Sequence, residues 1–411
     1  MVATKKKNNN DNFQPPAWLV VADDLTGACD TGIQFVRKGL GTIIVTSGLG
    51  LPDSKTQDAV VINTDSRNAD AAEAGMNLSR LGETLKPCVG RSIFYKKVDS
   101  TLRGNISAEA KALRAALGLG VVFFQPAYPQ NGRTALNGEL CLNGVPVHLT
   151  DIAKDPLKPI STSSLKETLN ESEDSYLSCD ALTDDDMKNA VIRVLETRRA
   201  EDVLWMGSAG LAGVITDILS KKEPPRPPVY DKKRTGPVFG LVGSYHPRNI
   251  VQIEKARLDS GVAVIAPDVN EMSKSSQSAA DAILDDILSE LEQKKDVLVV
   301  TAQTPGQRDR SKSDSNASEK ISDFLAFICR GAIQRAQDKG LFIGGIYLTG
   351  GEVASRVLRA LGVSELIPIR EVETGVPLLL ALNGQYNGFL VTKAGAFGSD
   401  ESVVKIIEAL R

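Results

Sequence analysis

The stretch Trp18-Leu-Val-Val-Ala-Asp23-Asp24-Leu-Thr26-Gly27-Ala28 decides the fold of the first half of the chain. A short apolar run, typical of a buried strand, ends in two adjacent carboxylates, and the apolar pattern of residues 28–36 then predicts a helix. Ligands of open α/β sheets bind outside the carboxyl ends of the strands, so we expect a site at this polar turn. Neighbouring side chains of an extended segment point opposite ways, so Asp23 and Asp24 are not expected to act as one unit. Capping of the helix by Asp24 or Thr26 is the plainer alternative, and the stretch alone leaves it open.

Length and composition indicate a soluble chain of two domains. The 411 residues exceed what one hydrophobic core usually serves, and 42% hydrophobic and 24% charged residues lie in the globular range. A net charge of -3 provides no basic field for nucleic acid or anionic lipid, and no apolar run is long enough to cross a bilayer. Five scattered cysteines and only two histidines indicate neither a zinc site nor a disulfide framework, so the reducing cytoplasm is the expected location.

Two stretches of biased composition divide the chain. Residues 1–16 are polar and predict a disordered tail, and the basic, Pro-rich residues 221–236 predict a linker. In 17–220 and in 237–411, predicted strands alternate with predicted helices in the manner of βαβ units. We therefore expect two α/β domains, each with a mostly parallel sheet flanked by helices, joined by the Pro-rich linker.

The segment after the fourth predicted strand, Ile93–Tyr95, is the densest polar stretch of the chain. It combines lysines, an arginine, an aspartate, hydroxyls and an amide directly before an Ala-rich helix expected at about 107–117. Cations can hold a carboxylate while hydroxyl and amide groups pair with substrate hydroxyls, so this group of side chains suits a small polyhydroxylated anion. The alternative is a solvated turn with surface charges. The residues concerned are Lys96, Lys97, Asp99, Ser100, Arg103 and Asn105, and Arg133 adds a cation after the fifth strand.

Three predicted strands of the second half end in small, glycine-rich turns before a helix. These turns lie at Gly243-Ser244, at Gly350-Gly351 and around Gly395. Backbone N–H groups at such turns can approach a phosphate without a side chain in the way. A single turn of this kind is more often structural, but three in one domain favour a phosphate site. The Walker A pattern does not occur, which disfavours an ordinary P-loop enzyme.

Taken together, these motifs resemble those of the four-carbon acid sugar kinases, two-domain ATP-dependent enzymes that phosphorylate tetronates. The resemblance runs over nearly the whole chain from about Trp18 and rests on Ala22-Asp-Asp-Leu-Thr-Gly-Ala28, Lys96-Lys-Val-Asp-Ser-Thr-Leu-Arg-Gly-Asn105, Asn131-Gly-Arg-Thr134, Gly207-Ser-Ala-Gly-Leu-Ala212, Gly350-Gly-Glu352 and Lys393-Ala-Gly-Ala-Phe-Gly398. It implies that the N-terminal domain binds the sugar acid and the C-terminal domain the nucleotide. Within the family, the D-threonate kinases look most similar in three segments, Asn63–Arg67, Lys96-Lys97 and Thr392–Asp400. The D-erythronate kinases look nearly as similar, and the 3-oxo-tetronate kinases more distant.

The resemblance also implies roles for individual residues. ATP contacts are expected at Ser244, Gly350, Gly351, Glu352, Val353 and Gly395. His246 is also expected to contact ATP, although many family members have a second small hydroxyl residue after the serine, where this chain has Tyr245 and His246. We expect the substrate carboxylate to be held by Arg67, by Lys96 or Lys97, and by Arg103. The other residues expected to bind the substrate are Ser100, Asn105 and Arg133. Asp24 or Asp99 would orient or deprotonate the terminal hydroxyl for in-line attack on the γ-phosphate.

Mg²⁺ is expected to bridge the phosphates, and Asp23 to contact a metal-bound water or a structural partner. Closure of the two domains across the Pro-rich linker would exclude water.

Two rival functions come from other classes. Phosphatases with an aspartyl nucleophile also begin with an aspartate-rich strand end, but they need carboxylates two residues apart, whereas Asp23 and Asp24 are adjacent. A non-catalytic sensor of sugar acid and nucleotide, with purely structural glycines, is the second rival. No nucleic-acid or membrane partner is expected. The sequence leaves open the tetronate stereoisomer, the metal ligands and the oligomeric state, a homodimer included.

Overall fold

The computed structural model describes residues 14–46, 48, 50–52, 57–155, 158–170, 175–220, 236–244, 246–268, 277–301 and 315–411. Most of the expected tail (1–16) and nearly all of the expected linker (221–236) lie outside these ranges, so both stay predictions. No helix in the described ranges has the length and apolar content that crossing a membrane requires.

Parallel strands form the sheet of the first half, in the order β2-β3-β1-β4-β10-β5-β9. They are β1 (Trp18–Ala22), β2 (Thr42–Val45), β3 (Ala59–Asn63), β4 (Ile93–Lys97), β5 (Val121–Gln125), β9 (Tyr176–Leu177) and β10 (Val203–Gly207). The register places Ala22 opposite Asn63 and Lys97, so the central strands end level with one another. The polar turns that follow them therefore meet at one edge of the sheet, as the sequence predicts.

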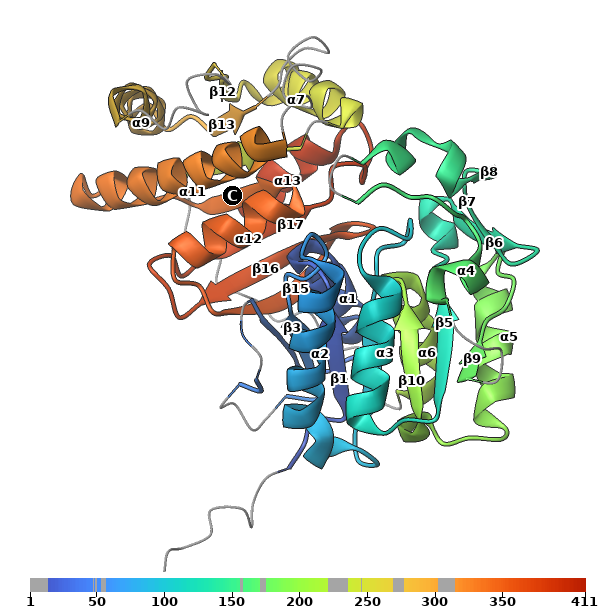
Figure 1. Ribbon diagram of the computed structural model, residues 1–411. Helices are drawn as coiled ribbons and strands as arrows, with labels where there is room; N and C mark the ends of the chain where they lie inside the picture. The colour runs from blue at the N-terminus through green and yellow to red at the C-terminus, as the bar shows by residue number, and fades with distance from the viewer. Residues whose placement is uncertain are drawn as a thin grey trace, which may run out of the picture.

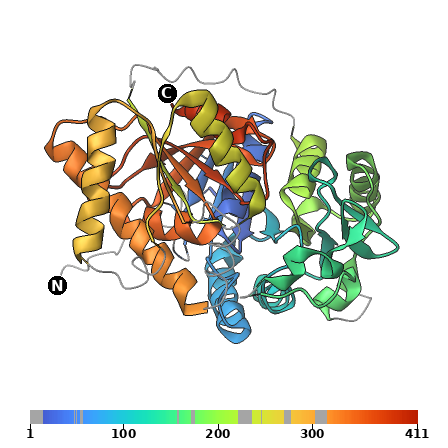
Figure 2. The same ribbon diagram turned by 90° about the horizontal axis from the view of Figure 1, so that it is seen from above.

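Helices cover both faces of this sheet, which explains why its strands are almost continuously apolar. The helices α2 (Ala71–Leu85) and α3 (Ile106–Leu117) pack together on one face. The other face carries α1 (Leu25–Val36), α6 (Ala209–Leu219) and α5 (Asp184–Leu195), as Figures 1 and 2 show.

The second half has parallel strands in the order β12-β13-β11-β14-β17, followed by the antiparallel hairpin β16-β15. Its strands are β11 (Val238–Val242), β12 (Ala263–Ile265), β13 (Val297–Val300), β14 (Gly345–Thr349), β15 (Glu365–Glu373), β16 (Val376–Leu382) and β17 (Phe389–Lys393). Its helices are α7 (Pro247–Ser260), α9 (Gln277–Glu292), α11 (Ser315–Asp338), α12 (Gly351–Ala360) and α13 (Ser402–Leu410). The register aligns the ends of β11, β14 and β17, so the three glycine turns also meet at one edge.

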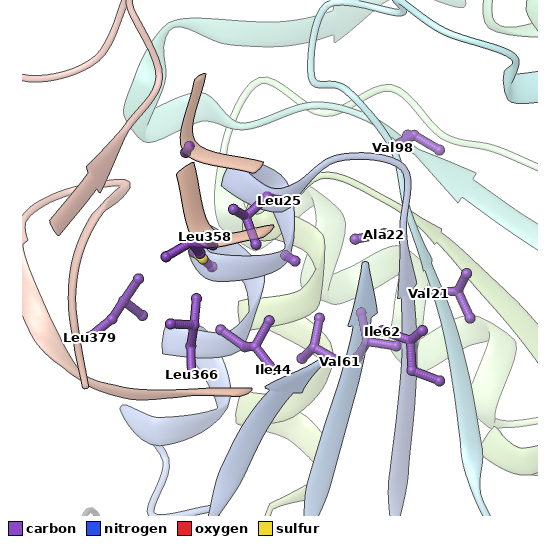
Figure 3. Packing of buried hydrophobic residues seen from close by; sticks show 14 of the residues in the cluster. Val21, Ala22, Leu25, Ile44, Val61, Ile62, Val98, Leu358, Leu366 and Leu379 are labelled. Carbon is purple, nitrogen blue, oxygen red and sulfur yellow. The ribbon is translucent and has the colours of Figure 1, made fainter. Parts of the chain in front are cut away.

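The two halves share a single 14-stranded sheet. Strand β15 pairs antiparallel with β2, with Glu365 opposite Val45 and Leu366 opposite Ile44. Figure 3 shows Leu25 and Ile44 of the first half packed beside Leu358, Leu366 and Leu379 of the second. The α/β class with mostly parallel strands is confirmed, whereas this common sheet and core were not expected from the sequence.

Smaller elements complete the described chain. The antiparallel strands β6 (Arg133–Leu136), β7 (Glu139–Leu142) and β8 (Val145–Pro146) form a separate sheet, and the short helix α4 (Leu165–Leu169) follows. The composition of residues 155–176, rich in Pro, Ser, Lys and Glu, predicts a long irregular loop or lid, and the helix α4 corrects this prediction for part of the stretch. Strand β4 is also longer than expected, because it includes Lys96 and Lys97 and does not end at Tyr95.

Candidate active site

The two adjacent aspartates at the end of β1 share one arginine. Arg67 donates from Nε to Asp23 Oδ2 at 2.9 Å and from Nη2 to Asp23 Oδ1 at 2.8 Å. The same Nη2 donates to Asp24 Oδ1 at 2.7 Å. Asp24 Oδ1 also accepts from the backbone N–H of Gly27 at 2.9 Å and caps α1. The capping alternative is therefore confirmed for Asp24. The capping bond uses Oδ1 and does not occupy Oδ2 of Asp24.

Asp99 lies in a second cluster of arginines. Arg103 donates from Nε and Nη2 to the two oxygens of Asp99, both at 3.0 Å. Nη1 of Arg67 lies 3.6 Å from Asp99 Oδ1, and the Thr101 hydroxyl donates to Oδ2. Arg103 also donates to Asp155 Oδ2 at 3.1 Å. Asp99 is thus enclosed by donors, and its oxygens already have partners.

These surroundings separate the acidities of the three carboxyl groups. Burial, with the neighbouring charges of Asp23 and Asp99, raises the pKa of Asp24 in spite of Arg67. Burial is also the largest influence on Asp23, but Arg67, Lys96 and Lys97 together outweigh it and lower the pKa of that group. At Asp99 burial is opposed by Arg103 and Arg67, which hold its pKa well below the usual range. Asp24 is therefore the strongest base of the three.

The two lysines at the end of β4 differ in what they contact. Lys96 is fully buried, its Nζ lies 2.7 Å from Glu109 Oε2, and Ser66 donates to the other oxygen of Glu109 at 2.6 Å. Lys97 Nζ donates to the carbonyl oxygen of Val98 at 2.7 Å and makes no ion pair within the described ranges. A Cβ at position 27 would lie 2.9 Å from this Nζ, so Gly27 leaves room for the ammonium group. Lys97 is accordingly the lysine without an ion pair among the described residues, and its charge also acts, against the effect of burial, to lower the pKa values of Asp23, Asp24 and Asp30.

The remaining residues expected to bind substrate lie around this cluster. Asn105 Nδ2 donates to the carbonyl oxygens of Ser66 and Ala69, both at 2.9 Å, so this amide braces the turn that carries Arg67. Ser100 is 8% exposed and lies on the turn after β4. The guanidinium carbon of Arg133 lies 5.1 Å from the ring centroid of Phe397, which belongs to the second half.

In the second half, the three glycine turns converge on Ser244. A Cβ at Gly395 would lie 2.0 Å from Ser244 Oγ, and one at Gly350 would lie 3.6 Å from Ser244 N. Gly350 has a φ of +99°, which disfavours any residue with a side chain there. Gly395 is therefore required for close packing against Ser244, and Gly350 for its backbone conformation. The backbone donors of such glycine turns can bind a phosphate, because no Cβ stands in the way.

The N-terminus of α12 provides such donors. Its N-cap residue, Gly350, has no capping side chain among the described residues. The first backbone N–H groups of a helix have no acceptor within it, so those of Gly351, Glu352 and Val353 can bind an anion. The side chain of Val353 itself packs beneath this turn, because a Cβ at Gly243 would lie 2.3 Å from Val353 Cγ2. Burial raises the pKa of Glu352, whose side chain lies 3.3 Å from Arg356.

His246 and Lys393 hold the neighbouring turns. His246 is the N-cap of α7 and accepts from the Arg248 backbone N–H at 3.3 Å. Lys393, at the end of β17, donates to Asn249 Oδ1 at 2.9 Å and to the carbonyl oxygen of Ala394 at 3.3 Å. Burial lowers the pKa of Lys393 to about 7. Lys393 was not among the residues expected at the site, although a lysine that ends an apolar strand is the signal that could have identified it.

The two clusters face each other across the junction of the halves. A Cβ at Gly351 would lie 2.8 Å from Asp24 Oδ2 and 3.1 Å from Thr26 Oγ1. The N-terminal end of α12 therefore abuts the carboxylate that has the raised pKa. This contact brings together the residues that the sequence assigned to separate domains.

Asp30, on α1, is a buried group that was not among the residues expected at the site. It is 5% exposed, and its Oδ1 has no hydrogen-bond partner in the part of the chain that the structure describes. Burial, opposed by Lys97, raises its pKa to about 7. Nothing in the local pattern of this helix distinguishes Asp30 from a surface aspartate.

The described residues do not assign a metal site. Among them, no group of three or more His, Cys, Asp or Glu side chains is placed to hold a metal ion. Asp23 and Asp99 are paired with arginines, which leaves few carboxylate oxygens for direct coordination.

Comparison with known proteins identifies both halves. Residues 18–175 match a sugar-binding N-terminal domain family, and residues 239–403 match a nucleotide-binding C-terminal domain family. A D-threonate kinase of Salmonella typhimurium is 29% identical over 94% of this chain and 96% of its own length. A D-threonate kinase of Cupriavidus necator is 30% identical, again over 94% and 96%. A D-erythronate kinase of Heliobacterium modesticaldum is 26% identical over 95% and 96%.

A solved structure shares the fold. The Salmonella typhimurium protein described as a putative tRNA synthase has a TM-score of 0.75 at 21% identity, and the match covers 94% of this chain and 98% of that one. At this level of identity, the likeness extends to the fold alone.

Proposed function

Because the chain belongs to the four-carbon acid sugar kinase family, we propose that it transfers the γ-phosphoryl group of ATP to the terminal, 4-hydroxyl group of D-threonate or D-erythronate. The observation that carries the proposal is the contact between Gly351, at the anion-binding end of α12, and Asp24. A phosphate seated at this helix end would lie beside a buried carboxylate with a raised pKa. Phosphoryl transfer requires such positioning of donor and acceptor more than covalent help from the protein.

The cationic cluster at the ends of β3 and β4 supports an anionic substrate. Lys97 has no ion pair within the described ranges, so its charge is available to the sugar-acid carboxylate. Arg67 and Arg103 line the same cluster, where Asp99 already holds them in place. Ser100 and Arg133 would contact substrate hydroxyl groups. Lys96 and Asn105 are engaged by protein partners, so we assign them the task of holding the neighbouring turns.

Asp24 is our candidate for the general base. Its Oδ1 is occupied by the Gly27 N–H and Arg67, whereas Oδ2 faces Gly351. The 4-hydroxyl would give its proton to Asp24 Oδ2 while its oxygen bonds to the γ-phosphorus and the bond from phosphorus to the leaving ADP oxygen breaks. Asp99 is a weaker candidate, because two arginines keep its pKa low and lower its basicity. Asp23, which pairs with Arg67, would act as a structural partner of this arginine.

The nucleotide would bind at the edge of the second half. Gly350 and Gly395 bring the backbone of their turns close to Ser244, and the first N–H groups of α12, from Gly351 on, would donate to phosphate oxygens. His246 and Glu352 would lie beside the bound phosphates. Mg²⁺, when bound to the phosphates, would neutralise charge that develops during the transfer.

D-threonate is the substrate that the comparisons favour. The D-threonate kinases are 29% and 30% identical to this chain, against 26% for the D-erythronate kinase. A 3-oxo-tetronate 4-kinase is the alternative within the family. Such an enzyme would act in carbohydrate metabolism of the cytoplasm, the compartment that the cysteine content favours.

A panel of four-carbon acids tests the proposal. The protein is incubated with Mg-ATP and D-threonate, D-erythronate, their L-isomers or 3-oxo-tetronates, and ADP and inorganic phosphate are measured separately. The proposal requires ADP formation that depends on the acid, without a matching release of phosphate. Free phosphate would indicate a hydrolase. A sensor would bind both ligands without forming ADP.

A further inference from the structure

The turn that follows β3, residues 63–67, contacts both halves of the molecule. Arg67 reaches Asp23 and Asp24 of the acid-binding cluster. Asp65, two residues earlier, reaches α12 instead: its Oδ2 accepts from Ser355 Oγ at 2.9 Å and from Arg359 Nη2 at 3.1 Å. One short turn thus carries a residue of the acid-binding cluster and an acceptor for the helix whose N-terminus is the anion-binding end.

The conformation of this turn is fixed by its own hydrogen bonds. Asp65 has a φ of +53°, a left-handed conformation that aspartate tolerates better than most residues. Its N–H donates to Asn63 Oδ1 at 3.2 Å, and Asn63 Nδ2 donates to the carbonyl oxygen of Thr46 at 3.0 Å. The Thr46 hydroxyl donates in turn to the carbonyl oxygen of Val363, just beyond α12, at 2.7 Å. The first half therefore holds α12 near its middle and again just after its end.

The bond to Ser355 is the stronger of the two contacts of Asp65. Ser355 is 6% exposed, and a buried donor that loses its acceptor is costly. The ion pair with Arg359 joins side chains that are 62% and 42% exposed, and exposed pairs contribute little. Ser355 lies one helical turn from Gly351, roughly 6 Å along the helix axis. A shift of α12 at Ser355 would therefore displace the anion-binding end from Asp24.

We propose that Asp65 is a positioning residue that sets the anion-binding end of α12 against the acid-binding cluster, so that phosphate donor and acceptor are aligned. The proposal rests on the proposed kinase function. Asp65 touches neither ligand and acts through Ser355 and through the turn that carries Arg67. Binding of either ligand would then favour the arrangement that the other one needs.

Four variants of the full chain separate this role from a merely structural one: Asp65→Ala, Ser355→Ala, and the controls Asp65→Asn and Arg359→Ala. For each, kcat and both KM values are measured with Mg-ATP and D-threonate. The affinities for D-threonate and for the non-hydrolysable analogue β,γ-methylene-ATP with Mg²⁺ are measured by calorimetry, each alone and with the other ligand present.

We expect Asp65→Ala and Ser355→Ala to lower kcat by about ten- to a hundredfold, since a misplaced reactant loses this much. The affinity for each ligand alone should lie within about threefold of the wild-type value. The mutual strengthening, by which each bound ligand raises the affinity for the other, should disappear. Asp65→Asn keeps an acceptor oxygen for Ser355 and Arg359→Ala removes only an exposed pair, so both should behave like wild type.

Three results would overturn the proposal. In one, Asp65→Ala leaves kcat and the mutual strengthening unchanged. In the second, it weakens each ligand alone and lowers the melting temperature, which is the pattern of a structural residue. In the third, wild type shows no mutual strengthening. Absence of acid-dependent ADP formation in wild type would instead refute the kinase function, and the binding measurements would still decide the role of Asp65.

Discussion

Replacing Asp24 by asparagine separates its chemical role from its structural ones. The amide keeps an oxygen that can accept from the Gly27 N–H and from Arg67, and asparagine caps helices as well as aspartate does. The atom that faces Gly351 changes from a basic oxygen to an amide nitrogen, which cannot accept a proton. The variant should therefore fold and fail at the transfer step.

The size of the effect follows from these contacts. A positioned general base contributes about 10²- to 10⁴-fold to the rate, or roughly 3–5 kcal/mol at about 1.4 kcal/mol for each factor of ten. Arg67 keeps its two hydrogen bonds to Asp23, at 2.9 and 2.8 Å, so the acid-binding cluster should remain assembled. We expect kcat to fall by about this factor and both KM values to stay within about tenfold of wild type.

The assay couples ADP formation to an absorbance change, with calorimetry of D-threonate binding to confirm that the acid site is intact. Asp99→Asn is the matched control, because it removes a carboxylate that is a poor base but holds Arg103. It should raise the KM for the acid more than it lowers kcat. A kcat of Asp24→Asn within about fivefold of wild type would refute the assignment of the base.

Three further substitutions test other parts of the site. Asp30→Asn removes a carboxyl group whose folded-state pKa is raised from 3.8 to about 7. The folded state holds this proton more tightly than the unfolded one, so wild-type stability should fall as the pH rises from about 4 to 7, by up to roughly 4 kcal/mol. Urea unfolding of the variant should lack this fall, and identical pH profiles would contradict the prediction. Arg103→Ala should raise the KM for D-threonate by about ten- to a hundredfold, while Mg-ATP still raises the melting temperature; loss of both effects would mean that Arg103 holds the fold. Gly351→Val should abolish stabilisation by Mg-ATP, because its Cβ would lie 2.8 Å from Asp24 Oδ2 and its branches would fill the phosphate space. Retained stabilisation would count against the position of the phosphate.

The sequence predicted those parts of the fold that depend on local pattern. The apolar run Ala59-Val-Val-Ile-Asn63 predicts a strand whose bounds agree with β3 to the residue. The polar strand ends meet at common edges, as the rule for parallel sheets requires. The β15–β16 hairpin and its pairing with β2 were not predicted. Residues 45 and 365 pair across more than half of the chain, and no local pattern specifies such a partner.

The candidate site was located by its polar residues, but their individual contacts depend on tertiary structure. Lys96 was expected in a turn, whereas it lies in β4 because Glu109 of α3 compensates its buried charge. Asp24 and Asp99 are both buried, but Asp24 lies near two other carboxylates and one arginine, whereas Asp99 lies between Arg103 and Arg67. These surroundings come from distant parts of the chain, so the sequence does not reveal the contrast between the two pKa values. The contact of Asp65 with Ser355 joins residues from opposite halves and carries no sequence signature.

The pairing of β2 with β15 also determines how the polypeptide can be divided. A fragment that stops at residue 220 would leave β2 as a bare, apolar strand edge, and the complementary fragment would expose β15 in the same way. Unprotected edges of this kind recruit other chains, so each fragment expressed alone should aggregate. Co-expressed fragments should instead assemble through these two strands into a soluble heterodimer, a split-protein complementation that needs no peptide bond between the halves.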